Sequence, residues 1–266
     1  MIDAWTLAYA AAGAFVGFLA GMLGIGGGMT LVPLLAAMFT AQQMAPGHTV
    51  HLALGTGMAS VVFTSSASVR THHQLGGVDW SLVRRMAPGM VVGTLLSTAL
   101  SGWVPQRLLA IAFAVVVFAG ATQILLGRKP KAGRTMPGTP ALAAIGVVIG
   151  IVAGLVSAGG AFMTVPVMLF CGVAMTTAIG TGAALGVPVA VVGTLGFVFS
   201  GWHVADLPPL AFGFVHVPAL LAIVAGSVLT APLGARAAHR LPGATLRKIF
   251  AGLLYVLAVK MLWTYG

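Results

Sequence analysis

Two glycine-rich runs in this chain could bind an anion through backbone N–H groups. Each run follows a long apolar segment and precedes a proline, Pro33 in the first case and Pro166 in the second. Glycine tolerates positive φ angles, so successive N–H groups can converge into a nest, and a helix that begins there adds the partial positive charge of its N-terminus. The predicted substrate-binding residues of the runs are Gly24, Gly26, Gly27 and Gly28 in the first and Ser157, Gly159, Gly160 and Ala161 in the second.

A second repeated motif supplies hydroxyl groups. Thr56 stands between two glycines, and Thr181 stands between two glycines in the matching segment of the second half. Each hydroxyl either lines the same cavity as the glycine runs or bonds back to the preceding helical turn. Because the motif is duplicated, we predict that both threonines line the cavity. Further hydroxyl residues make the first copy of this segment more polar than the second and predict an asymmetric cavity: Ser60, Thr64, Ser65, Ser66 and Ser68.

Acidic residues are few, and their positions bear on the charge of the substrate. Asp3, Asp79 and Asp206 all fall at the ends of apolar spans, where Asp79 and Asp206 are expected to cap the helices that follow. Cation carriers usually keep carboxylates inside the membrane. The sequence therefore favours an anionic substrate, which the formal net charge of +10 would attract.

Histidine is the remaining titratable side chain. His51 at the start of a span and His216 within a span could carry a coupling proton, contact an anion or be structural residues, and the sequence leaves their roles open. No nucleophile–base–acid set or metal-ligand cluster is evident, and the lone Cys171 fits an apolar filler. We therefore predict neither an enzyme, a metal site nor a cofactor. Other histidines are expected in loops or at the membrane interface: His72, His73, His203 and His239.

The composition places these residues in a lipid bilayer. The chain of 266 residues is 59% hydrophobic and 6% charged, with a mean hydropathy of +1.07, as is typical of a polytopic membrane protein. Lysine and arginine lie in loops or near the ends of apolar spans, so the basic composition reflects topology and not nucleic-acid binding. The apolar stretches lie at about 5–23, 29–41, 49–69, 83–101, 107–126, 141–158, 160–170, 177–199, 210–235 and 245–264.

The chain is predicted to contain two repeats. Residues 1–127 form the first membrane repeat, residues 128–139 a basic cytoplasmic linker, and residues 140–266 the second membrane repeat. The stretches 29–41 and 160–170 are too short to cross a bilayer, so each pairs with the helix before it as a broken element. Glycines four residues apart in those preceding helices suit packing faces: Gly13, Gly17 and Gly21, and Gly146, Gly150 and Gly154.

The basic loops indicate the orientation. Cytoplasmic loops are enriched in lysine and arginine. The basic clusters of this chain start at Arg70, occupy the linker and start again at Arg236. These clusters fall on one face only if each broken element enters and leaves on the same side, either as a re-entrant hairpin or as two short helices. We therefore predict an all-α fold of two inverted repeats, each a glycine-rich broken hairpin plus three transmembrane helices, with both termini external.

The first glycine run with its proline, the second copy at 150–168 and the paired Gly-Thr motifs resemble the TauE/SafE family of sulfite exporters and sulfonate permeases. The resemblance implies a carrier in the bacterial or archaeal inner membrane that moves sulfite, thiosulfate, sulfonates or related organosulfur anions. The chain departs from the family's pattern at Ser157 and Ala161, and Gly57 and Gly182 stand where a serine is frequent. These departures leave the exact anion open.

The predicted function is transport of a small sulfur-containing anion by alternating access. The anion is expected between the two hairpins near the bilayer midplane, with one repeat moving against the other. The alternatives are a passive anion channel and a non-transporting membrane scaffold whose glycines serve only helix packing. The sequence leaves open the direction of transport, the coupling ion, for which a proton is one candidate, and whether two chains form a homodimer.

Overall fold

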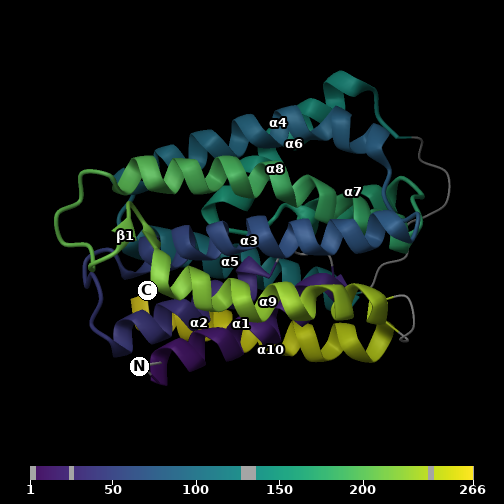
Figure 1. The fold of residues 1–266 in the computed structure, drawn as a ribbon. Coiled ribbons are helices and arrows are strands. Elements are labelled where there is room, and N and C mark those ends of the chain that lie inside the picture. The colour runs from purple at the N-terminus through teal and green to yellow at the C-terminus, as the bar shows by residue number, and fades with distance from the viewer. Residues whose placement is uncertain (1–3, 24–26, 127–135, 239–242, 266) are drawn as a thin grey trace.

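The fold consists mostly of helices (Figure 1). The computed structural model describes residues 4–23, 27–126, 136–238 and 243–265. The helices are α1 (Ala4–Leu23), α2 (Gly28–Ala41), α3 (Thr49–Gln74), α4 (Trp80–Ala99), α5 (Gln106–Leu126), α6 (Thr139–Leu155), α7 (Ala161–Phe170), α8 (Met175–Gly201), α9 (Val217–Ala238) and α10 (Gly243–Tyr265). A short 3₁₀ turn, η1, covers Ser101–Trp103, and strands β1 (Ala211–Phe212) and β2 (Val215–His216) form an antiparallel pair.

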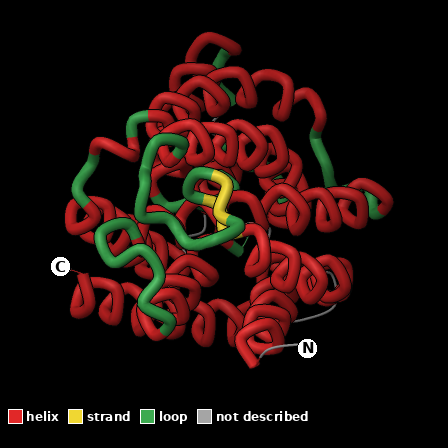
Figure 2. Tube along the Cα trace, turned by 60° about the vertical axis from the view of Figure 1, so that its left-hand side comes forward, coloured by secondary structure: helices red, strands yellow, loops and turns green. Residues whose placement is uncertain are grey.

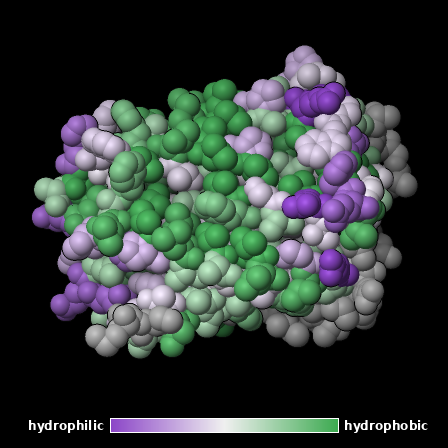
Figure 3. Space-filling view, viewed as in Figure 1, coloured by the Kyte–Doolittle hydropathy of each residue, from purple (hydrophilic) through white to green (hydrophobic). Residues whose placement is uncertain are grey.

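The surface of the bundle matches a membrane environment. Within the described residues, four helices, α1, α3, α8 and α9, are long and apolar enough to cross a bilayer. Large apolar side chains point outward, including Leu229 (74% exposed) and Phe199 (72% exposed), and lipid tails would cover them. Figure 3 shows an apolar band across the middle of the molecule, between more polar ends. The helical, multi-pass membrane class predicted from the sequence is confirmed.

Two interrupted segments share one local geometry. Helix α2 begins directly after Gly27, and α7 begins directly after Gly160, five residues beyond the end of α6 at Leu155. Gly27 and Gly160 both have a left-handed backbone with φ of 78°, which glycine adopts at little cost. The carbonyl of each glycine accepts hydrogen bonds from the third and fourth N–H groups that follow. The two helices therefore start in the same way.

Glycine stripes bring two helix pairs into close contact. On α1, a Cβ added at Gly13 would overlap the carbonyl oxygen of Ile223 in α9. On α6, a Cβ added at Gly150 would overlap the carbonyl oxygen of Met90 in α4. The prediction that these glycines form packing faces is confirmed. The same close approach to the partner helix holds for Gly17, Gly21, Gly146 and Gly154.

Helices α3 and α8 lie side by side in the middle of the molecule and run in opposite directions (Figure 1). A Cβ added at Gly186 of α8 would lie 2.9 Å from Oγ of Ser65 in α3, and one at Gly193 would lie 2.7 Å from Cε of Met58. Later residues of α8 therefore contact earlier residues of α3. The two helices are therefore antiparallel, in a register that places Gly186 opposite Ser65.

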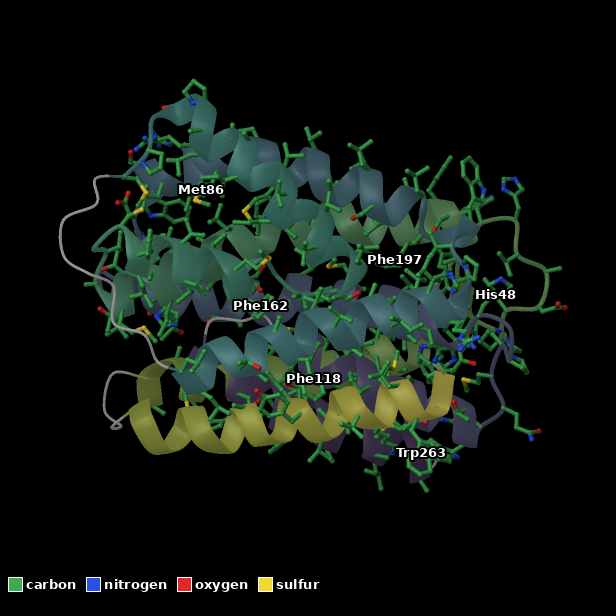
Figure 4. The ribbon with its side chains drawn as sticks, turned by 180° about the vertical axis from the view of Figure 1, so that it is seen from behind. His48, Met86, Phe118, Phe162, Phe197 and Trp263 are labelled. Carbon is green, nitrogen blue, oxygen red and sulfur yellow. The ribbon has the colours of Figure 1, made fainter. Side chains whose placement is uncertain are left out.

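The helices form two layers, and α3 and α8 lie where these layers meet. One core joins α4, α6, α7 and α8 around Met86 and Met90, and the other is formed largely by α1, α2, α3, α5, α9 and α10. Phe162 of α7 links the layers, because a Cβ added at Gly120 of α5 would overlap its ring. Figure 4 shows Phe162 between the helices that carry Met86 and Phe118.

The span expected at 210–235 begins later than predicted. Strands β1 and β2 occupy most of its first residues, and α9 begins at Val217. Leu210 and Gly213 have positive φ angles of 63° and 53°, which a right-handed helix excludes. Figure 2 shows the two strands at one end of the bundle, among its loops. The apolar residues before Val217 form this hairpin and not the first turns of a helix.

The two aspartates expected as caps differ in their roles. Asp79 caps α4, because its Oδ1 accepts hydrogen bonds from the N–H groups of Ser81 and Leu82. That prediction is confirmed. Asp206 lies in the loop before β1, and the hairpin separates it from α9. The prediction that Asp206 caps the following helix is therefore wrong.

Both chain ends lie at the same end of the bundle (Figure 1). Trp263, near the C-terminus, is 91% exposed, and Figure 4 places it toward the same end as His48. Trp80 is exposed at the start of α4, at the other end of the molecule. Exposed tryptophans at both ends fit an aromatic belt at the two membrane interfaces.

Candidate functional site

The two glycine runs meet inside the bundle. Gly28, the first residue of α2, lies so close to Ser157 that a Cβ on Gly28 would overlap the Ser157 carbonyl oxygen. The structure therefore brings the start of α2 against the turn that precedes α7. The predicted residues Gly24 and Gly26 lie outside the described residues. The other predicted residues of the runs are all buried: Gly27, Gly28, Ser157, Gly159, Gly160 and Ala161.

Ser157 holds the second turn against α3. Its φ of 50° is unusual for a residue with a side chain. Its hydroxyl donates a hydrogen bond of 2.7 Å to the carbonyl oxygen of Leu54 in α3. On the same helix, Gly57 leaves space for α2, because a Cβ there would lie 2.9 Å from Cγ2 of Val32. Both helix starts are thus positioned by the N-terminal half of α3.

The starts of α2 and α7 can donate hydrogen bonds to an anion. The N-cap residues of these helices are Gly27 and Gly160, so no N-cap side chain bonds the first N–H groups. The first turn of an α-helix has N–H groups without intrahelical partners, and the helix dipole adds positive potential there. The start of α2 lies against the turn that precedes α7, so this place favours a negatively charged ligand.

The structure does not bring the two predicted threonines together. Both are fully buried, Thr56 in α3 and Thr181 in α8. In the register that places Gly186 opposite Ser65, Thr181 lies opposite Arg70, about 14 residues and hence roughly 20 Å from Thr56 along the helix axis. A small anion could contact only one of the two hydroxyls.

Each threonine instead bonds the residue that precedes another helix. Thr56 Oγ1 accepts a hydrogen bond of 2.9 Å from the N–H of His216, before α9, and Thr181 Oγ1 accepts one of 2.9 Å from the N–H of Asp79, before α4. His216 Nδ1 also accepts from the N–H of Ala219, as Asp79 accepts in its own helix. The structural counterpart of Asp79 is therefore His216, which the sequence did not indicate.

Two histidines are buried in α3. His51 Nε2 lies 3.1 Å from the carbonyl oxygen of Ser101 and 3.0 Å from that of Val104, so this nitrogen donates to the η1 segment. His72 is fully buried, with Nε2 3.3 Å from the Gly21 carbonyl oxygen. The prediction that His72 lies in a loop is wrong, because α3 continues beyond the predicted end of the span. His73 and His203 are exposed, and His239 lies outside the described residues.

Basic side chains gather at the end of the bundle opposite the chain termini. Arg70 lies near the end of α3, Arg85 near the start of α4 and Arg236 near the end of α9. Nη2 of Arg85 donates a hydrogen bond of 2.6 Å to the carbonyl of Pro137. Within the described residues, no group of three or more metal-binding side chains occurs. The candidate site, where the start of α2 lies against the turn before α7, offers backbone N–H groups, and basic side chains lie at one end of the bundle.

Comparison with known proteins identifies the family. Residues 9–261 match the family described as sulfite exporter TauE/SafE. The chain belongs to this family. Among TauE/SafE relatives, a probable membrane transporter protein of Haemophilus influenzae is 35% identical over 250 residues, covering 94% of this chain and 95% of that protein. The probable membrane transporter protein YdhB of Bacillus subtilis is 25% identical over 239 residues, covering 87% and 90%.

The TauE/SafE relatives extend to the archaea. A probable membrane transporter protein of Methanocaldococcus jannaschii is 22% identical over 269 residues, covering 94% of this chain and 92% of that protein. No solved structure matches the chain. TauE/SafE membership identifies the chain as a probable membrane transporter and not an enzyme, as predicted.

Proposed function

We propose that this TauE/SafE protein transports a small sulfur-containing anion, which binds where the starts of α2 and α7 meet. The observation that carries the proposal is the contact between Gly28 and Ser157, which brings the glycine-capped start of α2 against the turn that precedes the glycine-capped start of α7. N–H groups of both helix starts would replace part of the water shell of the anion. The sulfur chemistry follows from the name of the family, sulfite exporter TauE/SafE.

The positions of the acids support an anion over a cation. Among the described residues, the carboxylates are Asp79, at the start of α4, and Asp206, in the loop before β1. Neither contributes to the meeting point of α2 and α7. A cation carrier would be expected to place a carboxylate there. Thr56 and Thr181 support the site by bonding α9 and α4, and at most one of them contacts the anion.

Reciprocal packing supports two inverted repeats, α1–α5 and α6–α10. Helix α1 of the first repeat packs on α9 of the second, and the counterpart of α1, which is α6, packs on the counterpart of α9, which is α4. Two further pairs, α3 with α8 and α5 with α10, join counterparts directly, and α4 packs on α8 as its counterpart α9 packs on α3. The matching backbones of Gly27 and Gly160 and the matching bonds of Thr56 and Thr181 agree with this relation.

This packing changes the expected moving parts. From the sequence, one repeat is expected to move against the other during alternating access. Because glycine stripes join α1 to α9 and α6 to α4, each repeat is tightly bound to a helix of the other. We therefore assign the movement to two mixed bundles: α1, α2, α3 and α9 in one, and α4, α6, α7 and α8 in the other. The anion would bind at their shared boundary.

The basic end of the bundle is proposed to face the cytoplasm of a bacterial or archaeal cell, across its inner membrane. Arg70, Arg85 and Arg236 lie at this end, and cytoplasmic loops are enriched in such residues. Both termini would then be external. A periplasmic reporter enzyme fused to the C-terminus should be active in cells, whereas activity of a cytoplasmic reporter at that position would reverse the orientation.

Binding and flux together test the proposed function. Sulfite, thiosulfate and alkanesulfonates should raise the melting temperature of the purified protein, because a ligand that binds the folded state stabilises it. In reconstituted vesicles, uptake of the stabilising anion should saturate with concentration, and its response to a proton gradient would test proton coupling. Unsaturable flux would indicate a passive channel. If none of these anions binds or is transported, the result would favour the scaffold alternative.

A further inference from the structure

Two serines of α3 differ from the other hydroxyl residues of that helix. The hydroxyls of Ser60 and Ser66 donate to backbone carbonyls of the preceding turn, as Thr64 and Thr71 also do. Ser65 and Ser68 are each only 2% exposed, and their Oγ atoms have no hydrogen-bond partner among the described residues.

The two unpartnered hydroxyls lie on one face of α3, because residues three apart in a helix are neighbours. Oγ of Ser65 lies beside the second glycine run. A Cβ added at Gly186 of α8 would be 2.9 Å from this Oγ and 3.0 Å from the carbonyl oxygen of Gly159. Ser65 therefore borders the turn that precedes α7, where the anion is proposed to bind.

The opposite side of the boundary has no equivalent hydroxyls. With Thr56 matched to Thr181, Ser65 corresponds to Ala190 and Ser68 to Gly193. Both counterparts are buried, but neither side chain can donate a hydrogen bond. The donor groups at the centre are therefore asymmetric, although α2 and α7 begin with the same backbone geometry.

We infer that Ser65 and Ser68 donate hydrogen bonds to an oxygen-rich anion held against the turn Ser157–Gly160. The inference rests on the proposed function, to which it adds the side-chain donors. A buried hydroxyl without a partner is costly, whereas one that donates to a charged oxyanion is strongly compensated. Two donors three residues apart on a rigid helix would bind two oxygens of one sulfite, thiosulfate or sulfonate group.

The test compares Ser65→Ala, Ser68→Ala and the double variant with Ser66→Ala. Ser66 is exposed, and its hydroxyl already bonds the Val62 carbonyl, so Ser66→Ala removes a neighbouring hydroxyl outside the site. Binding of sulfite, thiosulfate and methanesulfonate is measured by calorimetry on the purified full-length protein. Each site substitution should weaken binding roughly tenfold, and the double variant by more, as for loss of hydrogen bonds to a charged ligand.

The melting temperature of the ligand-free protein separates binding from folding. It should stay unchanged or rise in the Ser65→Ala and Ser68→Ala variants, because each removes an unpaired polar group from the interior. If a variant fails to fold, Ser65→Cys, which keeps the size and weakens the donor, replaces it and should also bind more weakly. If the double variant binds the anion with wild-type affinity, the inference about Ser65 and Ser68 is overturned, whereas the proposed function is not. Wild-type protein that binds none of the three anions would overturn the proposed function as well.

Discussion

At the scale of single residues, the proposed site depends on positions where a side chain has no space. Gly28 can touch the Ser157 carbonyl only because it lacks a Cβ. Gly27 and Gly160 begin their helices with a backbone that favours glycine. These positions let the start of α2 approach the turn that precedes α7, where the anion is proposed to bind.

Replacing Gly28 by alanine should destabilise the protein and weaken anion binding. The added Cβ would overlap the Ser157 carbonyl oxygen and force the two helix starts apart, and overpacking of a tight interior costs about 1–3 kcal/mol. Thermal unfolding and sulfite binding measure both effects. Gly47→Ala is the matched control, because a Cβ there meets nothing within 4 Å. Equal stability and binding in Gly28→Ala and wild type would contradict the contact.

The buried threonines are expected to contribute to stability independently of each other. Thr56→Val leaves the N–H of His216 without its acceptor, and Thr181→Val does the same to Asp79. Each loss should cost about 1–3 kcal/mol, and because the sites are roughly 20 Å apart the double variant should show additive losses. Chemical denaturation measures these values. Thr176→Val, on the exposed face of α8, is the control and should change little.

At the scale of elements, glycine spacing and helix pairing explain how the bundle is joined. The stripe on α1 packs on α9, and the corresponding stripe on α6 packs on α4. Small residues allow van der Waals contact between backbones, which drives helix association where lipid removes the hydrophobic contribution. The two pairings should therefore respond alike to the same substitution.

Gly17→Leu and Gly150→Leu should disrupt folding to a similar extent. In both cases a Cβ would collide with the backbone of the partner helix, Ser227 for Gly17 and Met90 for Gly150. The yield of monodisperse protein and its melting temperature report the effect. On α10, Gly252 meets nothing within 4 Å of an added Cβ, so Gly252→Leu should be tolerated. A large effect in one stripe and none in the other would argue against equivalent pairings.

At the scale of the whole molecule, the two mixed bundles make a prediction about motion. If α1 moves together with α9, a cross-link between them should leave transport intact. If α3 and α8 lie on opposite sides of the moving boundary, a cross-link between them should stop transport. This pattern differs from that expected if the two sequence repeats moved as bodies.

Cysteine pairs can test this pattern in a Cys171→Ser background. Ala14→Cys with Thr230→Cys would join α1 to α9, where Thr230 already bonds the Ala14 carbonyl. Met58→Cys with Gly193→Cys would join α3 to α8. After reaction with a short bifunctional thiol reagent, flux in vesicles should persist for the first pair and fall severalfold or more for the second, recovering on reduction. Inhibition by the α1–α9 cross-link would contradict the mixed bundles.

The sequence alone determined the features that depend on neighbouring residues. Hydropathy identified the membrane class, and glycines four residues apart identified packing faces without revealing their partners, because i and i+4 share a helix face. Asp79 was recognisable as a cap from the helix that follows it. The same prediction failed for Asp206, because the apolar residues of β1 and β2 have the composition of a span and only their backbone angles exclude a helix.

Only the tertiary structure decided which distant segments meet. It paired α1 with α9, matched Asp79 with His216 and separated Thr56 from Thr181 along two antiparallel helices. It also distinguished Ser65 from Ser66, since successive helical residues point about 100° apart and only the packing of α8 determines which direction is interior. Such pairings follow from shape complementarity between surfaces far apart in sequence, a property that neither residue type nor local spacing contains.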